Sequence, residues 1–304
     1  MYSRILVPLD GSRLSERILP WARSVVRTFN IPVELLVVIE PEAVAAFCDA
    51  KTGRYFDTVE ASMKRDSLAY LEKLGGSFSG PAEVHCFVEI GNPAEIIVDR
   101  ASADRGTLIA MATHGRSGVQ RWLLGSIAQK VLHAASNHLL LVRPEGGGNG
   151  AGEIVLKRVL VPLDGSALAE TVLPHVRALA ERMELEVILL RAYSMGPYAY
   201  AIGAEGYVPD IETLNADIKG EEAKRYLEEK ADQLRWQGVK NVSHLLLEGN
   251  AAGEIIDVAK GTPDSLVAMC THGRSGVGRW VLGSVTDRVV RHSGGPVLVI
   301  RAQG

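Results

Sequence analysis

Residues 112–126 read ATHGRSGVQRWLLGS, and residues 270–284 read CTHGRSGVGRWVLGS. Each stretch follows a short apolar run that is typical of a strand, and each leads into a helical pattern that we expect to begin at Ser126 or Ser284. A glycine-rich turn between a strand and a helix N-terminus presents backbone N–H groups to phosphate. The chain therefore predicts the same phosphate-binding loop in both of its halves.

The duplication extends well beyond this loop. The segment ILVPLDGS at 5–12 recurs as VLVPLDGS at 159–166. A glycine-rich segment separates the two copies, and its composition is typical of a flexible linker. We expect a first domain over 1–144, a linker over 145–153 and a second domain over 154–304, with each domain close to the commonest domain size.

Short apolar runs alternate with helical patterns within each copy. This order predicts an α/β fold in which a five-stranded parallel sheet carries helices on both faces. A doubly wound sheet of this kind binds its ligands beyond the carboxyl ends of the strands. In the first copy we expect strands near 3–9, 33–39, 83–89, 107–112 and 138–143, and helices near 57–74, 93–103 and 126–136.

Local signals refine the helix ends. Pro20 and Pro174 lie inside the apolar stripe of the first helix of each copy, so we expect that helix to be kinked or broken. Asn92 precedes a proline and is expected to cap the next helix. Ser126 and Ser284 begin capping-box patterns, which predicts that each serine caps its own helix.

Composition and charge exclude several classes of protein. The formal net charge is −3, and neither half is basic: residues 1–145 hold 16 Lys and Arg against 16 Asp and Glu, and the rest hold 17 against 20. We therefore expect no nucleic-acid partner. No apolar stretch approaches the roughly 20 residues of a membrane span, so we expect no membrane partner either. The chain opens directly into a strand without a signal-peptide pattern, which favours the cytoplasm.

Two segments of each copy should meet at the carboxyl edge of the sheet. One is the turn after the first strand, which carries Asp10 or Asp164, and the other is the glycine-rich loop. Within that loop, Arg116 and Arg274 would add positive charge near a phosphate. The chain has no P-loop signature, and the first turn lacks the Gly-x-Gly-x-x-Gly of dinucleotide-binding proteins.

These features also have structural interpretations. The glycines would then only build a tight crossover, and the two aspartates would cap the first helix of each copy. His114 and His272 would brace the loop by hydrogen bonds, although a catalytic base is a further interpretation. No Ser or Cys nucleophile with a third orienting group accompanies these histidines, so the sequence indicates no catalytic residue.

These motifs occur in the same order in both copies, and together they resemble the universal stress protein family in its tandem two-domain form. The resemblance spans both halves apart from the linker. It implies two Rossmann-like domains, similar to adenine nucleotide alpha hydrolases, and in many members an ATP site. The function it implies is that of an ATP-binding protein of the stress response, which acts as a nucleotide-dependent binding or regulatory module, with Mg²⁺ as a further ligand.

The family's ATP signature is Gly-x2-Gly-x9-Gly-Ser/Thr, and this chain matches it except at the first glycine. That position holds Ala112 or Cys270, each of which adds a Cβ near the phosphates and would be strained at positive φ. Thr286 would offer a hydroxyl to a phosphate. The contacts implied by the resemblance are Pro8, Leu9, Asp10, Val38, Met111, Ala112, Gly115, Arg116, Gly125, Ser126 and Ile127 in the first copy, and Pro162, Leu163, Asp164, Ala192, Met269, Cys270, Gly273, Arg274, Gly283, Ser284, Val285 and Thr286 in the second.

Other functions stay open at this point. A slow ATPase or autophosphorylating protein would use the same pocket, and a nucleotide-free scaffold would result if the first-glycine departures abolish binding. The family also pairs its domains through their last strands. We therefore expect the strands at 139–142 and 297–300 to run side by side and antiparallel in an intrachain pseudo-dimer, with a homodimer of the chain as a further possibility.

Overall fold

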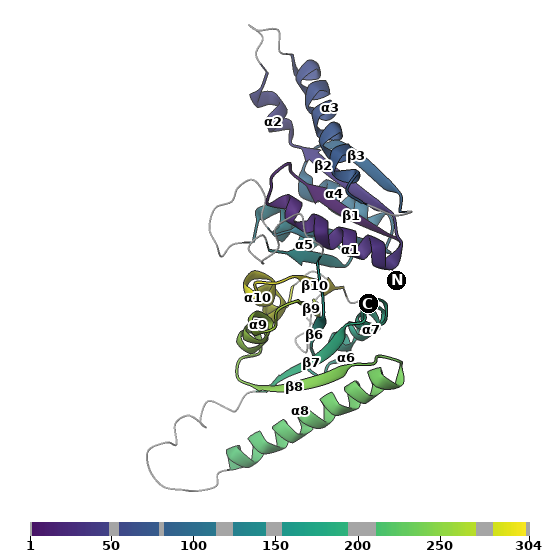
Figure 1. Ribbon diagram of the computed structural model, residues 1–304. Coiled ribbons are helices and arrows are strands. Elements are labelled where there is room, and N and C mark those ends of the chain that lie inside the picture. The colour runs from purple at the N-terminus through teal and green to yellow at the C-terminus, as the bar shows by residue number, and fades with distance from the viewer. Residues whose placement is uncertain are drawn as a thin grey trace. The chain divides into compact units, whose positions relative to one another are not determined.

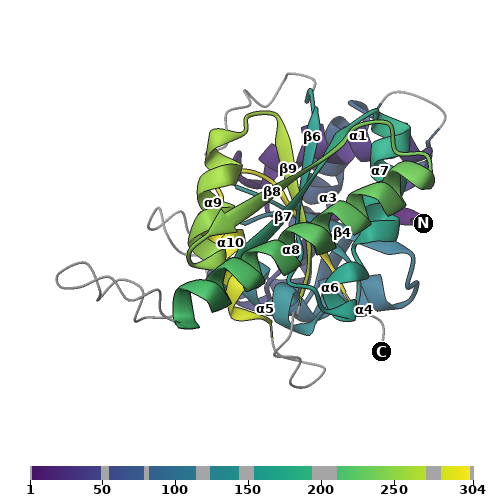
Figure 2. The ribbon, with the colours of Figure 1, turned by 90° about the horizontal axis from the view of Figure 1, so that it is seen from below.

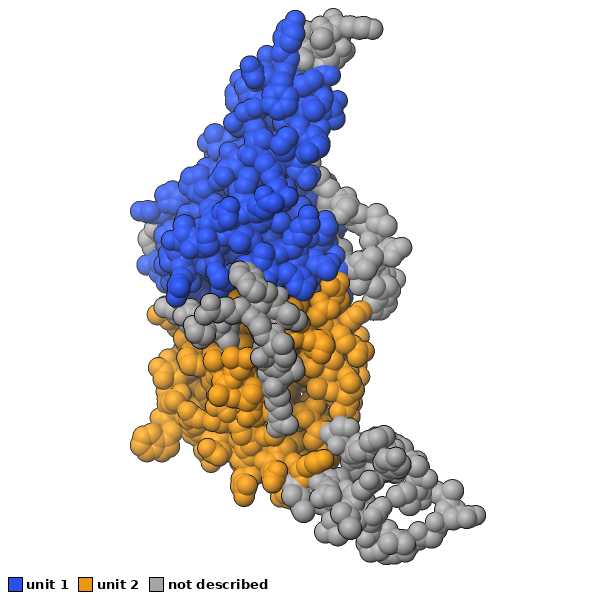
Figure 3. All heavy atoms as spheres, turned by 180° about the vertical axis from the view of Figure 1, so that it is seen from behind, with its two compact units in different colours: residues 1–154 blue, residues 155–304 orange. Residues whose placement is uncertain are grey.

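The computed structural model describes residues 2–48, 55–78, 82–113, 124–143, 154–193, 211–271 and 282–301, with only the backbone described for 211–218. The chain divides into two compact units, residues 1–154 and 155–304, which Figure 3 shows in blue and orange. The predicted linker at 145–153 lies outside the described residues.

Unit 1 contains a parallel sheet with the strand order β3-β2-β1-β4-β5 (Figure 1). Its strands are β1 (Arg4–Leu9), β2 (Val33–Ile39), β3 (Val84–Ile90), β4 (Thr107–Ala112) and β5 (Leu139–Val142). Every residue of β4 and β5 is buried, as expected for strands that are covered on both faces. All five expected strands are confirmed to within one residue at each end.

Unit 2 repeats this arrangement with the order β8-β7-β6-β9-β10, again all parallel. Its strands are β6 (Arg158–Pro162), β7 (Glu186–Tyr193), β8 (Val242–Glu248), β9 (Ser265–Cys270) and β10 (Val297–Ile300). The pairing register is also the same, because Pro8 pairs with Leu36 as Pro162 pairs with Leu190. Positions in the two units can therefore be matched one to one, and the predicted doubly wound α/β fold is confirmed.

Helices cover both faces of each sheet. Unit 1 has a 3₁₀ turn η1 (Ser15–Ile18) and helices α1 (Leu19–Phe29), α2 (Pro41–Ala46), α3 (Phe56–Gly75), α4 (Pro93–Ser102) and α5 (Ser126–Ala134). Unit 2 has α6 (Ala167–Glu170), α7 (Leu173–Met183), α8 (Ile211–Trp236), α9 (Ala251–Gly261) and α10 (Ser284–His292). α4 packs against α5, and α9 packs against α10, while α3 and α8 lie on the other face with η1 and α6. Figure 2 shows α8 running along β7 and β8.

The two internal prolines break the first helical stripe, as expected. Pro20 lies in the first turn of α1, and Pro174 lies in the first turn of α7. A proline is tolerated there because its missing N–H has no intrahelical partner at that position. The apolar stripe before it forms the separate elements η1 and α6. Asn92 caps α4 as predicted, since its side chain accepts from the amides of Ala94 and Glu95 at 3.1 and 3.5 Å.

Among the residues that the structure describes, no helix is both long and apolar enough to cross a membrane.

Candidate functional site

The turn after the first strand has the same geometry in both units. The glycine in it adopts a positive φ, +80° at Gly11 and +83° at Gly165, which other residues rarely adopt. Asp10 Oδ1 accepts hydrogen bonds from the amide and the hydroxyl of Ser12 at 2.9 and 2.6 Å. Asp164 Oδ1 accepts the same two bonds from Ser166, also at 2.9 and 2.6 Å. The aspartate therefore fixes the position of the serine that follows it.

This serine, rather than the aspartate, supports the helical turn that comes next. Ser12 Oγ accepts from the amide of Ser15 at 3.1 Å, and Ser166 Oγ accepts from the amide of Ala169 at 3.1 Å. Ser166 is the N-cap of α6. The alternative in which the aspartates cap the first helix is therefore replaced by an indirect role, in which each aspartate orients the capping serine.

The end of the fourth strand is tied directly to the start of the last helix. In unit 1 the Gly125 amide donates to the Thr113 carbonyl at 2.7 Å. In unit 2 the Gly283 amide donates to the Thr271 carbonyl at 2.8 Å. These bonds bring together the two ends of the glycine-rich loop, whose central residues lie outside the described part of the chain. The N-termini of α5 and α10 therefore lie at the carboxyl edges of their sheets.

The predicted capping boxes at Ser126 and Ser284 are wrong. The N-caps are Gly125 and Gly283, each with extended backbone and no side-chain cap, and the serines are the first helical residues. The hydrogen bond from the glycine amide to the strand end holds the glycine in the N-cap position. Because no N-cap side chain covers the first-turn amides, these groups keep their capacity to bind an anion.

The departures at Ala112 and Cys270 cause no backbone strain. Ala112 is the last residue of β4 and pairs with Val142, and Cys270 is the last residue of β9 and pairs with Ile300. Neither belongs to the non-glycine residues with positive φ in the described chain. A glycine is therefore not needed at this position for the backbone to reach its conformation.

The Thr286 hydroxyl does not serve the role that the sequence suggested. It is buried, and it donates to the Cys270 carbonyl at 3.0 Å. Its single proton is thus used within the protein, where it fastens α10 to the end of β9. The expectation that this hydroxyl donates to a phosphate is corrected, and the matching Ala128 in α5 is buried as well.

The other predicted contacts follow the strands to the same edge. Pro8 and Leu9 end β1, and Pro162 and Leu163 occupy the same place at the end of β6. Buried Met111 and Met269 precede the last residues of β4 and β9, and half-buried Val38 and Ala192 lie near the ends of β2 and β7. Ile127 and Val285 follow the first residues of α5 and α10. The remaining residues, Gly115, Arg116, Gly273, Arg274, His114 and His272, lie outside the described residues.

Sequence reasoning missed a tyrosine and a glutamate beside each turn. The Tyr70 hydroxyl on α3 donates to Glu16 at 3.0 Å, and the Tyr226 hydroxyl on α8 donates to Glu170 at 2.9 Å. Burial, together with the bond to Glu16, raises the pKa of Tyr70, and burial together with the bond to Glu170 raises the pKa of Tyr226. No local pattern shows these pairs, because each joins two elements that are far apart in the sequence.

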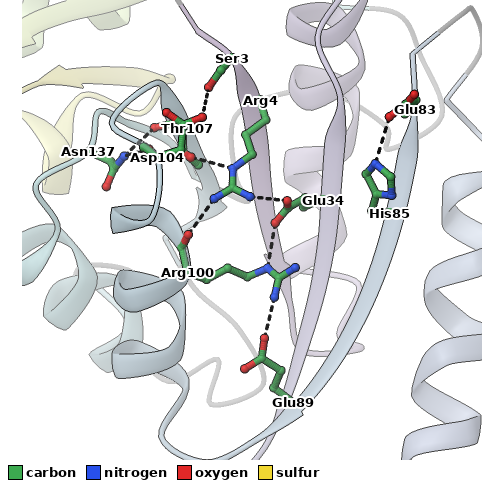
Figure 4. A network of polar contacts seen from close by, with 10 residues as sticks. All are labelled: Ser3, Arg4, Glu34, Glu83, His85, Glu89, Arg100, Asp104, Thr107 and Asn137. Atoms are coloured by element: carbon green, nitrogen blue, oxygen red, sulfur yellow. Dashed lines mark hydrogen bonds and ion pairs between the residues drawn. The ribbon is translucent and has the colours of Figure 1, made fainter.

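A second missed feature is a partly buried ionic network in unit 1 (Figure 4). Glu34 on β2 accepts from Arg4 on β1 and, at 2.8 Å, from Arg100 on α4. Arg100 also donates to Glu89 on β3 at 2.8 Å, and its guanidinium lies 3.5 Å from the centre of the Phe87 ring. A lone glutamate within the apolar run of β2 was the available signal. The network fastens three strands to α4 on the face opposite α3.

Comparison with known proteins agrees with this duplicated fold. The sequence profile of the universal stress protein family matches residues 1–143 and again 156–301. The chain belongs to the universal stress protein family. Both repeats of this tandem universal stress protein fall within the matched ranges, apart from the short segment between them.

Relatives of the same family cover one repeat or both. A universal stress protein of Mycolicibacterium smegmatis is 25% identical over 305 residues, which is 98% of this chain and 96% of that protein. Universal stress protein MJ0577 of Methanocaldococcus jannaschii is 30% identical over 157 residues, covering 49% of this chain and 96% of that protein. A crystal structure of a universal stress protein from Archaeoglobus fulgidus shares the fold, with a TM-score of 0.69 at 18% identity over 99% of both chains.

Proposed function

We propose that this universal stress protein binds an adenine nucleotide at the carboxyl edge of each sheet. It would act in the stress response as a nucleotide-dependent binding or regulatory module. The observation that carries the proposal is that both units have the same arrangement at the carboxyl edge of the sheet. In each unit an Asp–Ser turn follows the first strand, and the last helix begins with a glycine N-cap. The hydrogen-bond lengths of the turn agree between the units at 2.9, 2.6 and 3.1 Å.

In the proposed complex, the first-turn amides of α5 and α10 hold the phosphates. An anion is favoured there because the amides point outward and the helix dipole places partial positive charge at that end. Val38 and Ala192 would face the base, and Asp10 and Asp164 the ribose or a metal ion. The absence of positive φ at Ala112 and Cys270 supports the proposal, because the strand ends keep their shape without a glycine.

We expect Mg²⁺ to bind at this edge only together with the nucleotide. In the described parts of the chain, no group of three or more His, Cys, Asp or Glu side chains could hold a metal ion. Mg²⁺ is commonly bound by one or two carboxylates together with substrate phosphates. Asp10 and Asp164 could each supply such a carboxylate, and the ion would neutralise phosphate charge at the helix N-terminus.

We favour binding over rapid turnover. The chain has no P-loop lysine, and fast phosphoryl transfer depends on groups of that kind to stabilise charge on the transferred phosphoryl. The slow-hydrolase alternative is distinguished by ATP turnover that disappears in the D10N/D164N variant.

Equilibrium dialysis of the full chain against labelled ATP, with and without Mg²⁺, tests the proposal. We expect saturable binding that is lost in the double variant G115W/G273W. The matched control is G261W, because a Cβ at Gly261 at the end of α9 would have no neighbouring atom within 4 Å. No retention of ATP at millimolar concentration by the unaltered protein would refute the proposal.

A further inference from the structure

The two units differ in the residues beneath their otherwise matching turns. The shared register makes Arg191 on β7 the counterpart of Val37 on β2. Tyr226 and Tyr70 are counterparts because they donate to counterpart glutamates, so Lys230 on α8 takes the place of Leu74 on α3. Unit 2 thus places two cations where unit 1 has two apolar side chains.

Both cations are held close to the turn of unit 2. The Arg191 guanidinium carbon lies 4.6 Å from the centre of the Tyr226 ring. Its guanidinium atoms lie 3.1–3.3 Å from the point where a Cβ on Gly165 would stand. Lys230 Nζ contacts Glu170 Oε2 at 2.8 Å, and the lysine side chain is only 14% exposed. The aromatic ring therefore holds one positive charge against Gly165, the residue that follows Asp164.

Electrostatic effects on the two tyrosines reflect the same difference. Burial and Glu170 raise the pKa of Tyr226, and Arg191 lowers it, so this cation acts on the group of charges around the turn. Burial, Glu16 and Asp10 raise the pKa of Tyr70, and no cation among the described residues opposes them. Unit 1 has two cations of its own near its turn, because Arg13 and Arg17 stand where unit 2 has Ala167 and Thr171; Arg13 is exposed and Arg17 is half-buried.

We propose that Arg191, supported by Lys230, makes the unit 2 edge the tighter of the two sites for an anionic nucleotide. This inference rests on the proposed function. A fixed positive charge near a site attracts a polyphosphate through space, and salt screens that attraction. Removing one such charge weakens binding on the order of three- to ten-fold at low ionic strength.

Isothermal titration of the full chain with ATP at low salt tests the inference one site at a time. G115W leaves only the unit 2 site, and G273W leaves only the unit 1 site. Within the G115W background, R191V removes the charge and R191K retains it. The matched control is R158V, because Arg158 is a half-buried arginine at the opposite end of the same sheet, paired with Glu186 at 3.1 Å.

We expect the G115W protein to bind ATP several-fold more tightly than the G273W protein. R191V should abolish that advantage, R191K should restore most of it, and R158V should leave it unchanged. The difference should also shrink as salt is raised, which a merely structural role of Arg191 would not produce. The circular dichroism spectrum of R191V checks that this variant folds. If R191V does not fold, the salt dependence of ATP binding by R191K still tests the role of the charge.

The outcomes separate this inference from the proposed function. ATP binding that is equal at the two sites, tighter in unit 1, or unaffected by R191V overturns the inference and leaves the proposed function standing. Equal loss in R191V and R191K assigns Arg191 a packing role and also overturns it. Absence of ATP binding by the unaltered protein overturns both.

Discussion

The partly buried ionic network of unit 1 supports a quantitative prediction, because unit 2 has apolar residues at three of its four charged positions. Arg158, the counterpart of Arg4, stays charged and pairs with Glu186. Ile188 replaces Glu34, Leu247 replaces Glu89 and Val258 replaces Arg100. Both solutions occupy one fold. Replacing the ionic residues of unit 1 by the apolar residues of unit 2 therefore measures what the ion pairs contribute to the free energy of unfolding beyond packing.

The single substitution E34I should destabilise unit 1 by about 3–5 kcal/mol. The Glu34 side chain is only 9% exposed, and its removal leaves Arg4 and Arg100, each 21% exposed, facing each other without the shared carboxylate. Arg4 keeps its bonds to the Thr107 hydroxyl and to the backbone carbonyl of residue 100, at 2.8 Å each. These contacts are neutral, and the ion pair that Arg100 keeps with Glu89, which is 38% exposed, offsets only part of the loss.

The triple variant E34I/E89L/R100V should recover most of that loss. Replacing a buried ionic group by apolar residues of similar volume is often neutral or stabilising by about 1–4 kcal/mol. Unit 2 already packs this set of residues between β7, β8 and α9. Arg4 then loses a cationic neighbour and remains partly in contact with solvent.

Hydrogen exchange read by mass spectrometry suits this test, because it reports on each unit of a two-unit chain separately. Protection of peptides from β1, β2 and α4 should fall roughly 200- to 5,000-fold in E34I and return toward the original value in the triple variant. E186Q in unit 2 is the control, since the Arg158–Glu186 pair is 35% and 38% exposed and should contribute below about 1 kcal/mol. Equal hydrogen exchange in the single and triple variants would show that an uncompensated buried charge is not the cause of the lost stability.

Three further changes have expected outcomes. G165A should cost about 1–2 kcal/mol in urea unfolding, because φ is +83° and Arg191 lies against the new methyl, whereas G261A should cost nothing measurable. S166A should cost about 1 kcal/mol through loss of the α6 cap, seen as a lower melting temperature, and an unchanged value would contradict the capping role. Tyr70 and Tyr226 have raised pKa values in the folded state, so the unfolded chain releases their protons first as the pH rises. The stability they contribute is complete below about pH 10 and is lost above it, and Y70F/Y226F should flatten this decline in alkaline unfolding curves.

The strands could be predicted closely because a strand that is buried on both faces is an unbroken apolar run. Nothing outside the run is needed to recognise it, and the expected ranges of β2 and β4 match the structure at both ends. Asn92 is equally local, since its cap bonds reach only two and three residues along the chain.

Predictions failed where a distant partner decides the local structure. Serine is preferred to glycine at the N-cap position, so the sequence favours Ser126 and Ser284 as the N-caps. The hydrogen bonds from Gly125 to Thr113 and from Gly283 to Thr271 reverse that preference, and each spans the whole glycine-rich loop. Pairing of the last strands between the two units and binding of a nucleotide stay predictions.

Comparison of the two units distinguishes the geometry of the turn from the charge of the residues around it. The Asp–Ser turn has the same hydrogen-bond lengths above Arg191 and Lys230 as above Val37 and Leu74. The residues beneath therefore do not set its geometry. If the two sites differ in affinity for an anion, the shape of the turn is not the cause, which leaves charge and the other residues that differ between the sites, such as Ala112 and Cys270. A lysine at position 191 retains the charge but not the guanidinium stacking, so it distinguishes electrostatic attraction from packing at this position.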